Sequence, residues 1–178
     1  MNTIKKKNKG FSIVEIIIYA SLMAGLVGVI AYTINILFIA NLTVRATRRV
    51  ENSSIIATDR MVREIRAASS IDMSNSALHN TNTTIDGTLS LVIPTSSGTR
   101  SVRFYRDNEK IMVEENGIEV GPLTFSNVRV TSLQFYLATT SANVSQAVSF
   151  WFTLVGPTST PAVSEKFYGT VVLRGSYN

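Results

Sequence analysis

The fold of this chain is decided by a stretch near its start, KKKNKGFSIVEIIIYASLMAGLVGVIAYTINILFIA, which runs from Lys5 to Ala40. It opens with four lysines in five residues and a glycine, and from Phe11 it is almost wholly apolar. Glu15 is the one charge in the apolar part, and the 25 residues from Ile16 to Ala40 that follow it are uncharged. A helix needs ~20 apolar residues at ~1.5 Å each to cross a bilayer. The stretch therefore predicts a membrane-spanning helix.

A lone carboxylate inside such a segment is costly, by at least ~2.5 kcal/mol near the bilayer centre. Glu15 should therefore have a partner. If the chain is cut after Gly10, the new amine at Phe11 lies about one helical turn from Glu15. Between staggered neighbouring helices, that amine can also meet the carboxylate of the next subunit. We interpret the segment as a packing element with a register mark, and not as a plain anchor.

The same residues closely resemble the processing signal of type IV prepilins and pseudopilins. The resemblance lies in a basic leader, the motif GFSIVE and a long apolar run, and it covers residues 5–38. It implies that a prepilin peptidase cuts after Gly10 and methylates Phe11. It also implies that Glu15 pairs with a neighbour's N-terminus as the subunit joins a helical filament. The basic residues of the leader are Lys5, Lys6, Lys7 and Lys9.

Two further features refine this resemblance. Major pilins often carry a proline in the membrane helix, whereas this chain has none before Pro94, which favours a minor subunit. Towards the C-terminus, the segments LTFSNVRVTSLQFYL and VVLRG flank a long apolar strand. This order is similar to that of PilW-type minor pilins and J-type minor pseudopilins.

Composition narrows the possible partners. The 178 residues carry a net charge of +5, but four of the 17 Lys and Arg belong to the leader. Without the leader the chain has 13 basic and 12 acidic side chains, so its basic character does not indicate nucleic-acid binding. There is no cysteine, which excludes disulfides, thiol nucleophiles and cysteine metal sites.

We divide the chain into a cytoplasmic leader (1–10), a transmembrane or filament-core helix (11–40), an amphipathic continuation of that helix (41–70) and a β-rich head (71–178). The helix should run from about Phe11 to Ser69. Its continuation has an expected apolar stripe and charged residues on the other faces. The stripe comprises Leu42, Ala46, Val50, Ile55, Met61, Val62, Ile65 and Ala68. The charged residues are Arg45, Arg48, Arg49, Arg60, Arg63, Glu64 and Arg66.

The segment 69–87 is rich in Ser, Asn and Thr and is predicted to be a loop. The remainder predicts antiparallel strands, and the fold class is therefore α+β, with a long helix packed on an antiparallel sheet as in pilins. Expected strands cover 88–93, 99–106, 110–115, 118–120, 123–138, 144–156 and 165–175, the first ending at Pro94. Asp107-Asn108 and Asn116-Gly117 are expected turns. The alternation of apolar residues changes parity after Val130, which predicts a bulge or bend near Thr131-Ser132.

No catalytic constellation is present: the chain lacks a Walker loop, HExxH and GxSxG, so we expect no enzyme, cofactor or metal site. His79 is expected to be an exposed loop residue. Three acidic residues (Glu114, Glu115 and Glu119) are expected to form a solvated hairpin end, since alternation separates the first two. Alternation also places Arg103 on the opposite strand face from Arg100 and Arg106, and we do not expect direct binding of nucleic acid.

These observations predict a membrane-inserted minor pilin-like subunit of a type IV pilus or related filament. A minor pseudopilin of a type II secretion system is the alternative. From another class, a signal-anchored surface protein whose head binds a ligand or acts as an enzyme also stays open. Expected partners are the prepilin peptidase, other pilin or pseudopilin subunits, the inner-membrane assembly platform and the membrane. The expected location is the cytoplasmic membrane, with a cytoplasmic N-terminus and an extracytoplasmic head, and then an extracellular or periplasmic filament.

Overall fold

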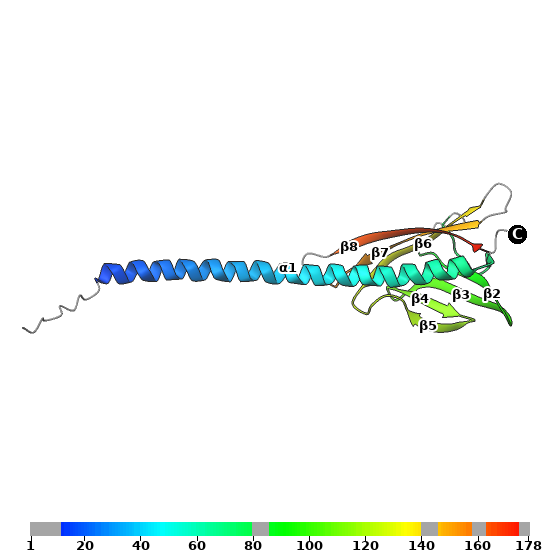
Figure 1. Ribbon diagram of the computed structural model, residues 1–178, viewed down its shortest axis with the longest axis horizontal. Coiled ribbons are helices and arrows are strands. Elements are labelled where there is room, and N and C mark those ends of the chain that lie inside the picture. The colour runs from blue at the N-terminus through cyan, green and yellow to red at the C-terminus, as the bar shows by residue number, and fades with distance from the viewer. Residues whose placement is uncertain (1–11, 80–85, 140–145, 158–162, 175–178) are drawn as a thin grey trace, which may run out of the picture. The chain divides into compact units, whose positions relative to one another are not determined.

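The computed structural model describes residues 12–79, 86–139, 146–157 and 163–174. By its internal contacts the chain divides into two units, Met1–Asn41 and Leu42–Asn178. Helix α1 (Ile13–Ala67) contributes to both units, and the strands belong to the second (Figure 1). The predicted helix is confirmed with bounds about two residues tighter at each end.

The first unit consists, in its described part, of α1 up to Asn41. All its described side chains are exposed except Glu15, which is partly buried. By length and composition this helix could cross a membrane. These apolar side chains have no cover within their own unit, so covering them with lipid or with other apolar helices would be favourable.

In the second unit, α1 turns one face to the core. The spacing of three and four residues is that of an amphipathic helix. Three predictions for this stretch are wrong: Leu42 and Ile55 are 37% and 63% exposed, whereas Glu64 is only 3% exposed. Small side chains take the place of Ile55, and the Ser53 hydroxyl accepts a hydrogen bond from the amide of Phe125 at 3.3 Å. The buried face comprises Ala46, Val50, Ser53, Ser54, Ala57, Met61, Glu64 and Ile65.

The described strands form two antiparallel sheets. The first has the order β1-β2-β3-β4-β5 and the second the order β6-β7-β8. Bounds in the first sheet are β1 (Ser70–Ile71), β2 (Leu89–Thr95), β3 (Gly98–Asp107), β4 (Lys110–Glu115) and β5 (Ile118–Pro122). Bounds in the second are β6 (Arg129–Thr139), β7 (Gln146–Val155) and β8 (Ser164–Val172).

Two local details test the strand predictions. The bulge is confirmed, because the β6–β7 register shifts between Val130 and Ser132. Because of this shift, the apolar side chains before the bulge and those after it face the same core, although they occupy strand positions of different parity. The predicted strand end at Pro94 is wrong, because β2 continues through Pro94, which pairs with Thr99 of β3. Since β1 pairs with β2 only up to Val92, the missing N–H of Pro94 breaks no described ladder on that side.

One hydrophobic core joins α1 to both sheets. It includes Met61 and Ile65 of the helix, Phe104 of β3, and Phe135 and Phe150 of the second sheet. The sheets meet where the amide of Val130 donates to the carbonyl of Glu109 at 2.8 Å. The fold is therefore α+β, with a long apolar N-terminal helix packed on antiparallel sheets. This is a pilin-like architecture.

Candidate functional site

The first candidate site is the exposed apolar part of α1. Its large apolar side chains are mostly 45–77% exposed. Burying apolar surface stabilises by roughly 25 cal/mol per Å². A segment with this much uncovered apolar surface is therefore suited to insertion into lipid or into a bundle of like helices. The isoleucines Ile13, Ile16, Ile17, Ile18, Ile30, Ile34, Ile36 and Ile39 are typical members.

Glu15 lies in the first turn of α1, where the helix macrodipole favours a negative charge. The hydroxyl of Tyr19 donates a hydrogen bond to Glu15 Oε1 at 3.3 Å. This contact was missed from the sequence, although the spacing of four residues on a helix places the two side chains together. A hydroxyl can solvate the carboxylate without neutralising it. The described contacts of Glu15 therefore include no cation, and another chain could supply one.

The other predicted site residues lie outside the described residues. They are Lys5, Lys6, Lys7, Lys9, Gly10 and Phe11. Cleavage after Gly10, methylation of Phe11 and pairing of Glu15 with a neighbour's amine remain predictions.

A second polar feature binds α1 to the first sheet. Arg60 of α1 and Arg100 of β3 both pair with Glu64 and with Glu115, which forms a closed ring of four charges. Arg60 Nε lies 2.9 Å from Glu64 Oε1, and Arg100 Nη2 lies 2.5 Å from Glu64 Oε2. The ring explains why Glu64 is buried and corrects the prediction that Glu115 belongs to a solvated hairpin end.

The other strand arginines are also paired. Arg103 pairs with Glu114 at 2.5 Å, and Arg106 pairs with Asp86 at 2.6 Å. Their guanidinium groups are therefore engaged by carboxylates of the same chain. This distribution gives no continuous basic patch on β3, in keeping with the separation predicted from alternation.

Three of the described groups of the head have shifted pKa values. Hydrogen bonds from the side chains of Ser74 and Asn75 lower the pKa of Asp72. Burial, followed by the Glu119 carboxylate, raises the pKa of Tyr105. Burial lowers the pKa of Lys110, whose ammonium nevertheless donates to the carbonyls of Phe125, Ser126 and Val128 at 2.5–2.8 Å. The ammonium thus ties β4 to the segment before β6.

The part of the chain that the structure describes contains no candidate metal site. No group of three or more His, Cys, Asp or Glu side chains there could hold an ion. His79 is exposed, as predicted, and its ring makes an edge contact with Trp151 at 5.6 Å between centroids.

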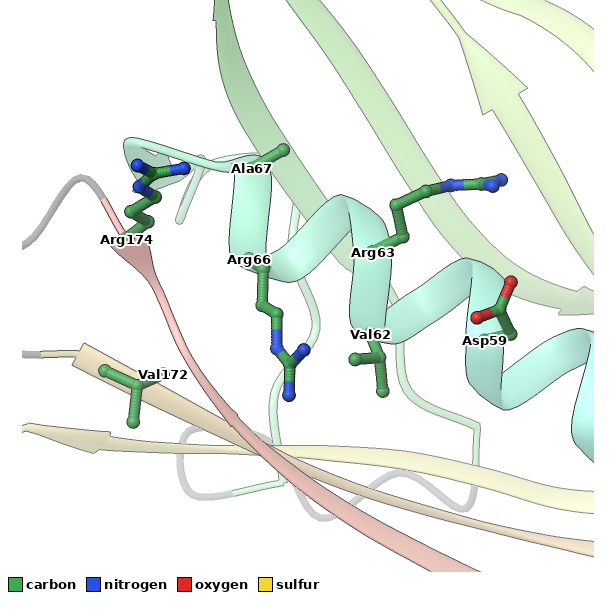
Figure 2. A pocket seen from close by; sticks show the side chains of 7 residues that line it. All are labelled: Asp59, Val62, Arg63, Arg66, Ala67, Val172 and Arg174. Atoms are coloured by element: carbon green, nitrogen blue, oxygen red, sulfur yellow. The ribbon is translucent and has the colours of Figure 1, made fainter.

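A groove lies beside the end of α1, with a volume of about 620 Å³. Figure 2 shows Val62 and Arg66 directed from the helix towards the side where Val172 lies, and Arg63 directed away from it. The three arginines of this groove have no ion pair with any described residue. It is lined by Asp59, Val62, Arg63, Arg66, Val172 and Arg174, together with Ala67.

The chain matches no protein-family model, and no characterised protein and no solved structure is significantly similar to it. Its pilin-like architecture therefore rests on its own elements: a helix long and apolar enough to cross a membrane, followed by antiparallel sheets.

Proposed function

We propose that this chain is a minor pilin-like subunit of a type IV pilus or related filament. In this proposal the prepilin peptidase removes residues 1–10 and methylates Phe11. The first half of α1 then leaves the membrane for the helical core of the filament, with the assembly platform as the machinery that transfers it. The role is structural, with no catalysis by the head.

The observation that carries the proposal is the unit up to Asn41. It presents apolar side chains on every face of α1, with one carboxylate in the first turn. Glu15 stands four residues after Phe11 in the motif GFSIVE. A helix meant only as an anchor gains nothing from a carboxylate, which costs at least ~2.5 kcal/mol in the bilayer. A helix that packs against staggered copies gains a register check.

The decisive experiment is the mass of the N-terminal peptide, measured from cells with and without an active prepilin peptidase. We expect a peptide that begins with methylated Phe11, present only when the peptidase is active. An intact leader through Gly10 in peptidase-competent cells would overturn the proposal and favour a signal-anchored surface protein. Once processing is shown, dependence on an outer-membrane secretion pore would assign the subunit to a type II secretion system.

A further inference from the structure

Strand β8 (Ser164–Val172) has an edge that no described strand covers. It is the last strand in the order β6-β7-β8 and pairs only with β7 among the described strands. About half of the backbone N–H and C=O groups of an antiparallel edge strand face away from its partner. These groups are available to another strand.

The groove at the end of α1 continues along this strand. A second hollow of about 460 Å³ adjoins the first, and both are lined by Asp59 and Val62. Its walls carry exposed apolar groups: Ile55 is 63% exposed and Tyr168 is 70% exposed. We call the two hollows together the α1–β8 groove. An unpaired strand edge beside apolar walls suits an extended peptide.

The α1–β8 groove is also positively charged. Arg63, Arg66 and Arg174 line it, against the single carboxylate of Asp59. Every arginine of β3 and β6 has a carboxylate partner, whereas these three have none among the described residues. Because Arg63 is directed away from the Val172 side (Figure 2), Arg66 and Arg174 give the groove an excess of one positive charge over Asp59, which favours a strand that brings a carboxylate.

The exposed edge at β5, on the first sheet, carries apolar side chains and a negative charge, and so complements the α1–β8 groove. Strand β5 (Ile118–Pro122) ends the first sheet and pairs only with β4 among the described strands. Ile118 and Val120 are 72% and 59% exposed, and Glu119 lies between them. In Figure 1, β5 and β8 lie on opposite sides of α1.

The β5 edge carries an unbalanced negative charge. Glu119 lies directly opposite Glu114 in the β4–β5 register. Like charges in this arrangement destabilise the strand pair. Arg103 pairs with Glu114, while the one partner of Glu119 among the described residues is the hydroxyl of Tyr105, at 3.1 Å. A cation supplied from outside would relieve this repulsion.

We propose that β5 of one copy of this chain adds to the β8 edge of a second copy, in the α1–β8 groove. The contact joins two sheets by backbone hydrogen bonds, covers exposed apolar side chains and brings Glu119 to Arg66. Because the two surfaces differ, each head can receive one neighbour and donate to another, which produces an open row of heads. A nucleic acid strand would instead need a longer basic track with stacked aromatic rings. The contact does not require removal of the leader.

The absence of cysteine from the chain permits a direct test in the full-length protein in its membrane. Val120→Cys on β5 and Thr170→Cys on β8 are introduced into one chain and oxidised mildly, with Tyr168→Cys as a second β8 position. We expect a ladder of disulfide-linked dimers, trimers and longer species, and only dimers when two chains with one cysteine each are mixed. The matched control pairs Val120→Cys with Tyr136→Cys, an exposed position on β6, and should give no ladder.

Charge reversal tests the ionic contact in the same assay. Arg66→Glu should reduce the ladder several-fold, and adding Glu119→Arg should restore it, since both side chains are exposed and their replacement leaves the core unchanged. Absence of a ladder with either β8 cysteine, insensitivity to the reversals or a ladder in the control would overturn the proposal. Cross-linking of the β8 cysteine to a different protein would contradict the proposal that a second copy of this chain occupies the groove. The ladder is expected with or without prepilin peptidase. A missing ladder would therefore contradict the contact between heads, whereas an intact leader would contradict the proposed function.

Discussion

Glu64 shows how one residue fixes the helix on the head. Its side chain is almost fully buried, forms an ion pair with Arg60 on its own helix and accepts a hydrogen bond from Arg100 on β3. A buried carboxylate without partners is strongly disfavoured, and removing one member of such a group leaves the others uncompensated. The ring therefore selects one rotation of α1 against the first sheet.

Glu64→Gln is expected to lower the free energy of unfolding by about 1–3 kcal/mol. The expected loss is no larger because the two arginines are 25–28% exposed and still pair with Glu115. Urea unfolding of the detergent-solubilised chain, followed by fluorescence of Trp151, measures the change. Trp151 is the only tryptophan of the sequence. Glu51→Gln is the control on an exposed face of the same helix and should stay within about 0.5 kcal/mol. Equal effects of the two substitutions would show that the ring contributes nothing measurable.

At the scale of elements, the first sheet contains two tight hairpins of the same kind. Both central residues of each turn have positive φ: 45° and 59° at Asn108 and Glu109, and 51° and 79° at Asn116 and Gly117. This is the type I′ geometry that matches the twist of the flanking strands. Glycine adopts it without strain, whereas glutamate costs roughly 1–2 kcal/mol there.

Glu109→Gly should therefore raise the free energy of unfolding by about 0.5–1 kcal/mol, after allowing for the greater flexibility of glycine in the unfolded chain. The lost ion pair with Arg129 is 3.6 Å long and about half exposed on both sides, so its loss should matter little. The reverse change, Gly117→Glu, should lower stability by about 1 kcal/mol. Thermal unfolding of both variants provides the measurement. If Glu109→Gly instead lowers the free energy of unfolding, the interactions of the Glu109 side chain stabilise the turn by more than its positive φ destabilises it.

At the scale of the whole molecule, the two units have different surfaces. The head has its own core, made from α1 and both sheets. The unit up to Asn41 has no buried side chain among its described residues. Apolar surface of this extent is suited to association with lipid or with other apolar helices, and Glu15 is the one carboxylate among the described residues of this unit.

Glu15→Ala is expected to spare membrane insertion and impair incorporation into filaments, because it removes the proposed charge pair while making the helix more apolar. The measurements are membrane fractionation and the amount of subunit in sheared filaments. Tyr19→Phe is the matched control, since it removes the local hydrogen bond to Glu15 and keeps the carboxylate. Normal incorporation of the Glu15→Ala chain would contradict the role assigned to this residue.

The features that could be predicted from the amino-acid sequence are local ones. The apolar run sets the helix, Asn116-Gly117 sets a hairpin, and the change of parity after Val130 sets the bulge, because each depends on the preferences of neighbouring residues. The burial of Glu64 depends on tertiary packing, since its partner Arg100 lies 36 residues away in the sequence. Tertiary packing also brings Arg66 and Arg174 to one groove, from segments more than 100 residues apart. Contacts between residues so distant in the sequence depend on which faces of α1 and the sheets pack together. The periodicity of apolar residues within one segment does not contain that information.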